Sequence, residues 1–337
     1  MDARRWFGTL ADGRDVEAIR LGTAGGLQAE VLTYGAILHG LSFPVAGRRR
    51  ELVLRLDRVE DYENDRAYVG PVVGRFANRI ARGRFSIDGT RHQLTTNENG
   101  NHLHGGALGT GKRLWRVRGE PTPTQAILQL HSPAAEEGYP GALDITLQLD
   151  LADNVLVIDL SAQCDAASPV NLTYHPYFNL GGDAADHWLR IPASRFLPVG
   201  PGLIPTGEIA SVDGTPFDFR AGQVLRAPPP GAHPQLAAGG GFDHCWLIDA
   251  GADCHCELRS ASRDVALTIS GTRPGLQFYG GQFLSRTHPR IGTAIALEPQ
   301  GLPDAPNHPA FPDAILRPGN TYRARIEYRV EALTPPR

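Results

Sequence analysis

Residues 171–180 read Asn171-Leu-Thr-Tyr-His-Pro-Tyr-Phe-Asn-Leu180, and the rest of the chain can be interpreted outward from them. Two segments that alternate apolar and polar residues, 142–151 and 155–163, precede this stretch. Such alternation is typical of β-strands that bury one face. Pro176 lacks a backbone donor and disfavours helical geometry at His175. The stretch therefore predicts extended structure with an imidazole aimed out of a sheet, and a packed core histidine is the alternative.

The same strand pattern recurs along the whole chain. Turns rich in glycine (39 residues) and proline (27 residues) separate short apolar segments. Only residues 58–65 have an early helical pattern, and residues 181–241 are predicted to be mostly loop. This spacing favours an antiparallel sandwich or barrel, so we predict an all-β fold with few short helices. The predicted strands are 6–10, 16–21, 27–33, 37–43, 51–56, 83–87, 91–95, 113–118, 125–131, 142–151, 155–163, 242–249, 255–259, 265–270, 275–279, 293–297 and 321–330.

Composition narrows the class of protein. The chain has 337 residues, of which 41% are hydrophobic and 20% charged, so it should fold. Strands of the same character resume after residue 241, so we predict a single domain over residues 1–337. A net charge of −3 gives no electrostatic case for a nucleic acid or an anionic membrane as partner. We see no secretory h-region or 18-residue apolar span, which predicts a cytoplasmic protein.

Three polar residues interrupt strands that are otherwise apolar. Glu298 ends the small-residue strand 293–297, while Asp243 and Gln277 lie within 242–249 and 275–279. Burying an ionisable group without a partner costs several kcal/mol, so each should be paired or should face a cavity. A carboxylate at the end of a small-residue strand is well placed for acid–base chemistry. Ordinary solvated strand residues remain the alternative for all three.

His102 and His104 are two residues apart and would share a face on a strand. A metal site formed by these two side chains with His175 and a carboxylate is therefore one hypothesis. It lacks a further compact ligand pair such as H-x-x-E-H.

Four separated motifs together resemble the aldose 1-epimerase (galactose mutarotase) family. Segments that contain Asp243 and Gln277 fall between the last two motifs, in the expected order. Each motif is weak alone, but six segments in the right order are specific, and they span nearly the whole chain. The four motifs are Gly74-Arg-Phe-Ala-Asn-Arg-Ile80, Asn101-His-Leu-His-Gly-Gly106, residues 171–180, and Leu297-Glu-Pro-Gln300 continuing to Pro303-Asp-Ala-Pro-Asn307.

The resemblance implies a large β-sandwich of the galactose mutarotase type with a sugar cleft and with no cofactor or metal. It implies an isomerase that interconverts the α and β anomers of free aldohexoses such as galactose and glucose. A small-molecule sugar would be its partner, and the protein would be a monomer or homodimer. The implied roles are His175 as general acid, Glu298 as general base, His104 as an aid on the ring-oxygen side and in substrate binding, Asn78, Arg79, Asp243 and Gln277 as ligands of sugar hydroxyls, and Tyr177 as a lining residue.

Anomer interconversion needs a proton acceptor and a proton donor. The C1 hydroxyl loses a proton while the ring oxygen gains one, and each positioned transfer is worth roughly 10²–10⁴-fold in rate. Ordinary pKa values are about 4.3 for glutamate and about 6.5 for histidine. We therefore expect Glu298 to be ionised at neutral pH, and His175 to keep its proton through a nearby carboxylate, with Asp243 as the obvious choice.

Alternatives to this function remain at this point. A non-catalytic sugar-binding module of the same fold would bind sugar without accelerating its anomerisation, and a metal-dependent sandwich enzyme would use His102, His104 and His175. A two-carboxylate glycosidase could be built on Asp243 and Glu298. The chain also departs from the family pattern at Tyr174 and Pro176, which leaves the preferred sugar open.

Overall fold

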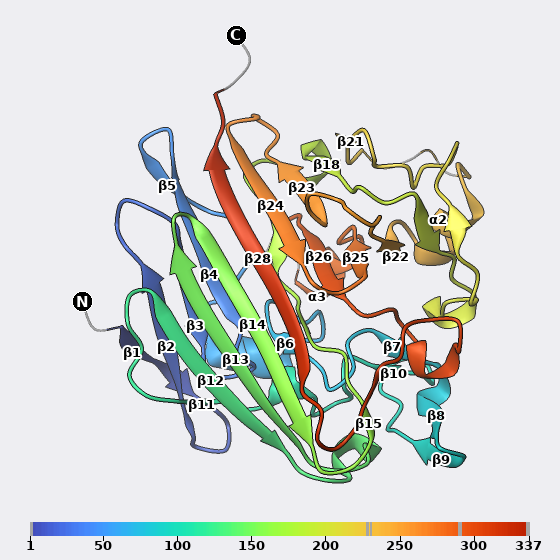
Figure 1. The fold of residues 1–337 in the computed structure, drawn as a ribbon. Helices are drawn as coiled ribbons and strands as arrows, with labels where there is room; N and C mark the ends of the chain where they lie inside the picture. The colour runs from blue at the N-terminus through green and yellow to red at the C-terminus, as the bar shows by residue number, and fades with distance from the viewer. Residues whose placement is uncertain (1–2, 227–228, 230, 289–291, 335–337) are drawn as a thin grey trace.

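The computed structural model describes residues 3–226, 229, 231–288 and 292–334, which form antiparallel sheets packed face to face (Figure 1). The largest sheet runs in the order β11 (Arg116–Val117), β12 (Gln125–Ser132), β13 (Leu143–Ala152), β14 (Val155–Cys164), β28 (Tyr322–Ala332), β24 (Val265–Gly271), β23 (Cys256–Arg259), β18 (Trp188–Arg190) and β21 (Gln223–Val224). A five-stranded sheet contains β1 (Arg4–Thr9), β2 (Asp15–Gly22), β3 (Gln28–Leu32), β4 (Leu38–Val45) and β5 (Arg48–Glu51). A six-stranded sheet runs in the order β17 (Tyr177–Phe178), β26 (Ile295–Gln300), β25 (Gly275–Tyr279), β22 (Asp243–Leu247), β19 (Arg195–Leu197) and β20 (Ala210–Ser211).

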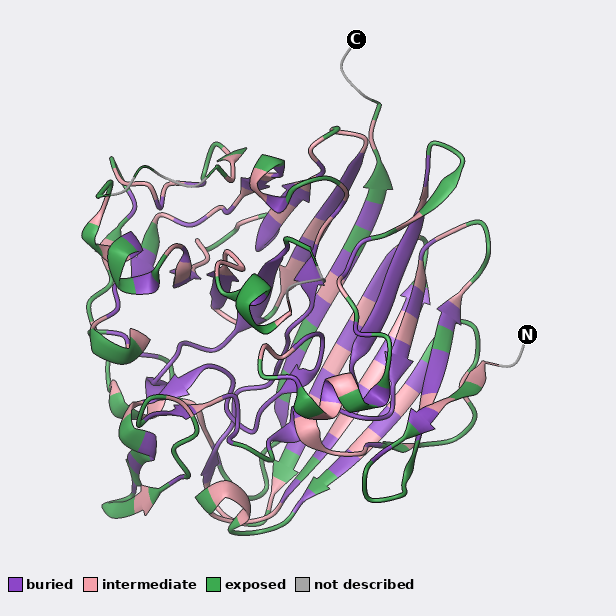
Figure 2. Cartoon of the chain, turned by 180° about the vertical axis from the view of Figure 1, so that it is seen from behind, coloured by how far each residue is buried: buried purple, intermediate pink, exposed green. Residues whose placement is uncertain are grey.

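One continuous apolar core joins these three sheets. It contains Leu41 of β4, Leu147 of β13 and Leu297 of β26, all fully buried. The ring of Phe178 meets that of Tyr328 edge to face, with centroids 5.4 Å apart, which joins the six-stranded sheet to the nine-stranded one. Buried and exposed residues alternate along the long strands, as Figure 2 shows. The predicted all-β sandwich is confirmed.

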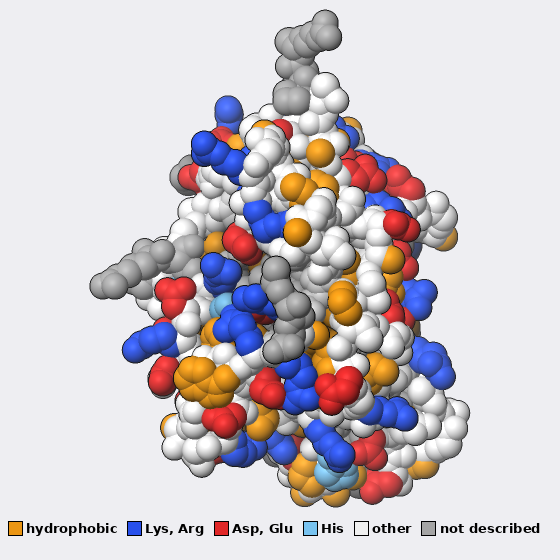
Figure 3. Space-filling model, turned by 90° about the vertical axis from the view of Figure 1, so that its left-hand side faces the viewer, with side chains coloured by type: hydrophobic (Ala, Val, Ile, Leu, Met, Phe, Trp, Pro, Cys, Tyr) orange, Lys and Arg blue, Asp and Glu red, His pale blue; other side chains and the backbone are white. Residues whose placement is uncertain are grey.

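Helices are short and few in the described part of the chain. The three α-helices are α1 (Val59–Asn64), α2 (Pro234–Gly239) and α3 (Leu284–Thr287). None of the described helices is long and apolar enough to cross a membrane. On the face drawn in Figure 3, basic and acidic side chains are interspersed rather than separated by sign.

Alternation in the six-stranded sheet gives it one apolar and one polar face. In β25, Leu276 and Phe278 enter the core, so Gln277 and Tyr279 point to the opposite face. The pairing partners of β25 carry further polar residues on that face, because Gln277 lies opposite Glu298 and Tyr279 opposite Asp243. The polar residues that interrupt these strands thus share one side of one sheet.

The 171–180 stretch connects the other motifs by hydrogen bonds. The side chain of Asn171 donates to the carbonyl of Ala77 and accepts from the N–H of Gly301 at 2.7 Å. Thr173 Oγ1 donates to the carbonyl of Pro299 at 2.7 Å. Four short strand pairs complete the fold: β6 (Val72–Val73) with β16 (Thr173–Tyr174), β7 (Arg79–Ile80) with β10 (His102–Leu103), β8 (Arg84–Ile87) with β9 (Thr90–Gln93), and β15 (Ser168–Pro169) with β27 (Ile315–Leu316).

Three sequence predictions differ from the structure. Of the strand predicted at 113–118, only residues 116–117 form a strand, β11. The strand predicted at 51–56 is β5, residues 48–51, and only Val53 of the predicted segment makes an isolated bridge. β5 is a mostly exposed edge strand of three arginines and a glutamate, so it has no apolar alternation to reveal it. The segment 181–241 is mostly loop as predicted, but it adds β18 and β21 to the nine-stranded sheet and β19 and β20 to the six-stranded one.

Candidate active site

A cavity of about 410 Å³ opens on the polar face of the six-stranded sheet. This volume lies within the range of small-molecule sites, which is about 300–1,000 Å³. The six-stranded sheet, which includes β17, supplies half of the predicted residues. The segments around β7 and β10 supply most of the rest. All eight sequence-predicted site residues line this one cavity: Asn78, Arg79, His104, His175, Tyr177, Asp243, Gln277 and Glu298.

Strand register brings His175, Glu298 and Gln277 into one row. In the β17–β26 ladder Tyr177 pairs with Ala296, so the same antiparallel register continued by two residues sets His175 opposite Glu298. Glu298 in turn pairs with Gln277 across β25. His175 Nε2 lies 3.6 Å from Glu298 Oε1, and both side chains are almost fully buried. The three residues therefore form a polar row across adjacent strand segments.

Several atoms of this row have no protein partner within the described residues. They are Nδ1 of His175, Oε2 of Glu298 and Oε1 of Gln277, and all three are buried. Buried polar atoms in folded proteins are nearly always hydrogen-bonded, so unpaired ones need an explanation. Their position at a cavity indicates groups whose hydrogen bonds are completed by a ligand or by water.

Burial controls the protonation of the pair. It lowers the pKa of His175 to about 4, with only small opposing effects from a backbone hydrogen bond and from Asp65. It raises the pKa of Glu298 well above its usual range, an effect that Asp243 increases and Arg79 opposes. Both pKa shifts run against the expectation of an ionised Glu298 and a protonated His175 at neutral pH, because desolvation outweighs nearby charges.

Asp243 is not the partner of His175. Its Oδ1 accepts a hydrogen bond from Gln277 Nε2 at 2.6 Å, and its Oδ2 lies 3.9 Å from Arg79 Nη1. Burial raises the pKa of Asp243, while Arg79 and then Gln277 oppose that rise. The carboxylate of Glu298 faces His175 instead, because the strand register sets these two residues opposite each other.

His104 is held as a neutral hydrogen-bond donor. The backbone N–H of Asn78 donates to His104 Nδ1 at 3.2 Å, so the ring proton must reside on Nε2. Burial lowers the pKa of His104 well below its usual value, and His175 lowers it further. The two imidazole rings meet edge to face with centroids 5.2 Å apart. His104 can therefore offer an N–H next to His175.

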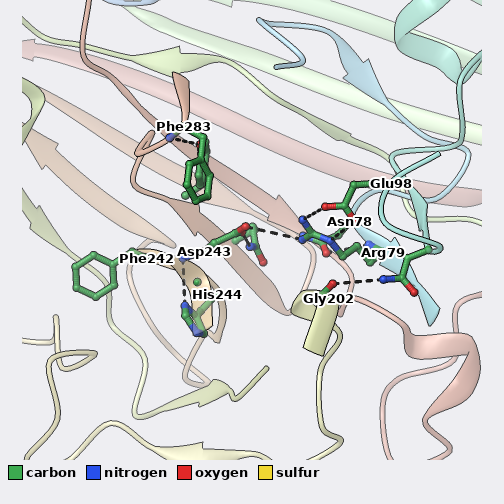
Figure 4. A network of polar contacts seen from close by, with 12 residues as sticks. Asn78, Arg79, Glu98, Gly202, Phe242, Asp243, His244 and Phe283 are labelled. Atoms are coloured by element: carbon green, nitrogen blue, oxygen red, sulfur yellow. Dashed lines mark hydrogen bonds and ion pairs between the residues drawn. The ribbon is translucent and has the colours of Figure 1, made fainter. Parts of the chain in front are cut away.

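A chain of polar contacts runs from Glu98 through Arg79 to Asp243 (Figure 4), and Gln277 extends it by donating a hydrogen bond to Asp243. Arg79 donates to both carboxylate oxygens of Glu98, at 3.2 Å from Nε and 2.9 Å from Nη2, and approaches Asp243 on its other side. Although burial opposes its charge, Asp243 and Glu98 raise the pKa of Arg79. Asn78 accepts from the backbone N–H of Arg79 through Oδ1, which fixes its amide beside the guanidinium.

Sequence reasoning missed several lining residues, among them Tyr68, Glu98, Tyr279 and Phe283. Tyr279 could have been found, because strand alternation sets it on the same face as Gln277. Glu98 lies in a polar loop without periodicity and Tyr68 in an irregular segment, so neither carries a local signal. Only the folded chain brings them to the cavity.

The metal hypothesis that combined His102, His104 and His175 does not fit the geometry. β10 ends at Leu103 and His104 has φ +50°, so the two histidines do not share a strand face. His102 uses both ring nitrogens inside the protein, toward the carbonyl of Thr95 and the hydroxyl of Tyr139, each at 2.7 Å. Within the described ranges, no three His, Cys, Asp or Glu side chains are grouped as metal ligands would be.

Glycine at position 105 permits the approach of the two segments that carry Asn78 and His104. Gly105 has φ +86°, and a Cβ atom there would lie 1.6 Å from the carbonyl oxygen of Gly74.

The two departures from the family pattern, Tyr174 and Pro176, do not line the cavity. The Tyr174 hydroxyl donates to the carbonyl of Ala36 at 2.5 Å inside the core.

Comparison with known proteins identifies the family of this chain. The sequence model of the family described as aldose 1-epimerase matches residues 17–329. This chain belongs to the aldose 1-epimerase family. It is 38% identical to the galactose mutarotase of Homo sapiens over 95% of both chains. It is 36% identical to the aldose 1-epimerase of Escherichia coli (strain K12), over 94% of this chain and 96% of that one.

Solved structures of the family superpose closely on this chain. A galactose 1-epimerase from Lactobacillus acidophilus NCFM matches with a TM-score of 0.88 at 28% identity, covering 98% of this chain and 99% of the other. An aldose epimerase homologue from C. elegans gives 0.85 at 32% identity, covering 94% and 99%. As a member of the aldose 1-epimerase family, the protein is an isomerase that interconverts sugar anomers, and the predicted family and class of activity are confirmed.

Proposed function

We propose that the cavity binds a free aldohexose such as galactose or glucose and that His175 and Glu298 catalyse the opening and closing of its ring. Galactose is named for the human and Lactobacillus relatives, which supports it as a substrate here. The observation that carries the proposal is the buried His175–Glu298 pair, 3.6 Å apart, with unpaired polar atoms on both side chains. A separation of 3.6 Å is longer than a hydrogen bond, so the two groups remain available to a ligand.

The opposite pKa shifts of the two residues favour a pair that shares one proton. Burial favours a protonated Glu298 beside a neutral His175 in the empty site. The reactive arrangement, ionised Glu298 and protonated His175, contains the same number of protons. Sugar binding can therefore produce the base and the acid by moving one proton within the pair, without exchange with solvent.

In the proposed reaction Glu298 takes the proton of the C1 hydroxyl while His175 gives a proton to the ring oxygen. The C1–O5 bond breaks and an aldehyde forms. Rotation about C1–C2 presents the other carbonyl face, and the reverse transfers close the ring with the opposite configuration. No electron or group leaves the sugar, so atoms and charges balance with these two residues alone.

The remaining residues would hold the sugar in place. We assign His104, through its Nε2–H, to the ring-oxygen side, and Asn78, Arg79, Asp243 and Gln277 to sugar hydroxyls. Charged groups form stronger hydrogen bonds than neutral ones, which suits Arg79 and Asp243 to this task. Tyr177 lines the cavity beside His175, with ring centroids 5.1 Å apart, and its hydroxyl is already committed to the carbonyl of Ala67 at 2.8 Å.

Polarimetry tests the proposal directly. Freshly dissolved α-D-galactose and α-D-glucose should reach rotational equilibrium faster with the protein than in buffer, and treatment with EDTA should leave the rate unchanged. A folded protein that does not exceed the buffer rate between pH 6 and 8 would show that the proposed substrates are wrong. Saturable sugar binding without acceleration would instead favour a binding module.

Three further expectations from the sequence stay predictions. We propose a single domain over residues 1–337, a monomer or homodimer, and a cytoplasmic location. Size-exclusion chromatography with light scattering would measure the oligomeric state.

A further inference from the structure

Asp65 lies outside the cavity but holds one of its walls. It follows α1, and its side chain is 4% exposed. Its two carboxylate oxygens accept hydrogen bonds from the backbone N–H groups of Ala67 and Val69, both at 2.7 Å. These two N–H groups flank Tyr68, which has φ +57°, a conformation that L-residues rarely adopt. Asp65 therefore fixes the backbone on both sides of a strained residue.

The segment from Ala67 to Val69 contacts His175, the predicted catalytic histidine, and the side chains around it. The ring of Tyr68 lies 4.6 Å from that of His104 and 6.1 Å from that of His175, measured between centroids. The carbonyl of Ala67 accepts the hydroxyl of Tyr177, whose ring packs on His175. A shift of this segment would consequently move the groups that surround His175.

The same carboxylate reaches the wall formed by α3. His288 Nε2 lies 2.7 Å from Asp65 Oδ1, and the backbone N–H of His288 donates to the carbonyl of Leu284 at 2.8 Å. Residues of and next to α3, including Phe283 and Thr287, line the cavity. Asp65 and His288 thus join two cavity walls that are far apart in the sequence.

Lysine 112 completes the anchor. Lys112 Nζ donates to the carbonyls of Tyr62 and Asp65, each at 2.7 Å, and to that of Glu63 at 3.2 Å. The only lysine of the chain therefore holds the carboxyl end of α1 and is not among the cavity-lining residues. The backbone of Asp65 is fixed independently of its side chain, so the carboxylate can be changed while the helix end remains anchored.

We propose that Asp65 and His288 are a positioning pair that sets the Tyr68 segment and α3 at the correct separation around the sugar. Neither residue touches the reacting atoms in this scheme. His288 holds the α3 wall, so it should affect mainly sugar binding. Asp65 holds both walls, so it should affect both binding and the chemical step. The inference rests on the proposed function, because the readout is anomerisation of a sugar in this cavity.

The test compares His288→Ala, His288→Gln, Asp65→Asn and a matched control, Asp88→Asn, by polarimetric kcat and KM. We expect His288→Ala to raise KM about tenfold with kcat within about twofold of wild type, since a hydrogen bond to a charged group is lost. His288→Gln can donate an amide N–H to Asp65 and should return KM most of the way. Asp65→Asn should raise KM and also lower kcat. Asp88 pairs with Arg317 on the exposed surface and neither residue lines the cavity, so Asp88→Asn should change neither kcat nor KM.

Two results would refute the proposal that Asp65 and His288 are a positioning pair. One is a folded His288→Ala protein with KM within about twofold of wild type; the other is a KM that stays equally high in His288→Gln. If Asp65→Asn does not fold, the two His288 variants decide. If the wild type itself does not accelerate anomerisation, the proposed function is wrong. Backbone amide hydrogen exchange then tests the proposed Asp65–His288 pair independently. Unchanged exchange of the α3 backbone amides, among them that of Arg286, in His288→Ala would then refute it.

Discussion

His175, which lies between β16 and β17, faces Glu298 of β26, with Nε2 of the imidazole 3.6 Å from Oε1 of the carboxylate. This arrangement follows from the pairing of Tyr177 with Ala296, because His175 is two residues before Tyr177 and Glu298 two residues after Ala296. Because antiparallel register fixes which side chains face each other, the two groups hold their separation without needing a direct hydrogen bond. The pairing of the strands therefore determines the distance between the two predicted catalytic groups.

Removing either member of this pair should abolish most of the acceleration while the protein stays folded. We expect Glu298→Gln and His175→Asn each to lower kcat/KM by roughly 10²–10⁴-fold, the usual contribution of a positioned acid or base. Polarimetry measures the rate and circular dichroism the fold. Glu331→Gln and His131→Asn make the same chemical changes on the exposed surface and should retain full activity. A folded Glu298→Gln protein with wild-type kcat/KM would exclude Glu298 as the base.

The pH dependence of kcat/KM should lack an inflection near 6.5. Burial lowers the pKa of His175 to about 4, so this imidazole should not titrate near 6.5, and it raises the pKa of Glu298 well above its usual value, so the carboxyl group tends to keep its proton. As the pH falls through about 4, His175 gains a proton while Glu298 keeps its own, and the base is lost. Above the raised pKa of Glu298 the pair loses its proton, and activity falls again. A rate profile with a single step at pH 6–7 would contradict this assignment.

Stability should fall as the pH is lowered from about 6.5 to 4. Burial lowers the pKa of seven histidines, so in this window the unfolded chain binds more protons than the folded one. With a folded-state pKa of about 4, His39 and His175 would each cost about 3 kcal/mol of unfolding free energy at pH 4 relative to pH 7. The seven are His39, His102, His104, His175, His187, His244 and His255.

Calorimetry at pH 7 and pH 5 measures this effect as a lower midpoint at pH 5. The raised pKa values of Asp243 and Glu298 act in the opposite direction, because the folded state then binds the additional protons. His39→Gln should reduce the difference between the two midpoints. His131, whose side chain is 61% exposed, offers the matched control His131→Gln, which should leave the difference between the midpoints unchanged. A midpoint that rises on acidification would show that the carboxyl groups dominate.

Glu98 should position Arg79 for the sugar. Its carboxylate accepts two hydrogen bonds from the guanidinium, and without its charge Arg79 would be drawn toward Asp243. We expect Glu98→Gln to reduce kcat/KM about tenfold, mainly through KM, because charge-assisted hydrogen bonds contribute about 1.5–3 kcal/mol. Glu60→Gln on the exposed side of α1 is the control. An unchanged KM in Glu98→Gln would mean that Arg79 keeps its position without this partner.

The sequence determined the fold class and the membership of the site. Alternating strands predicted the sandwich, and the polar interruptions at Asp243, Gln277 and Glu298 were recognisable because charge is costly inside an apolar strand. With the family motifs, they led to eight residues that all line one cavity. These features depend on local pattern, which the chain carries without its tertiary structure.

Only the tertiary structure decided the electrostatics and the supporting contacts. Burial depends on how the sheets pack, so the lowered pKa of His175 and the raised pKa of Glu298 could not be read from residue type. The partner of His175 is Glu298 rather than Asp243, because strand register and not motif order sets which side chains meet. Glu98, Tyr68 and the Asp65–His288 contact come from loops without periodicity, and long-range packing alone brings them to the cavity.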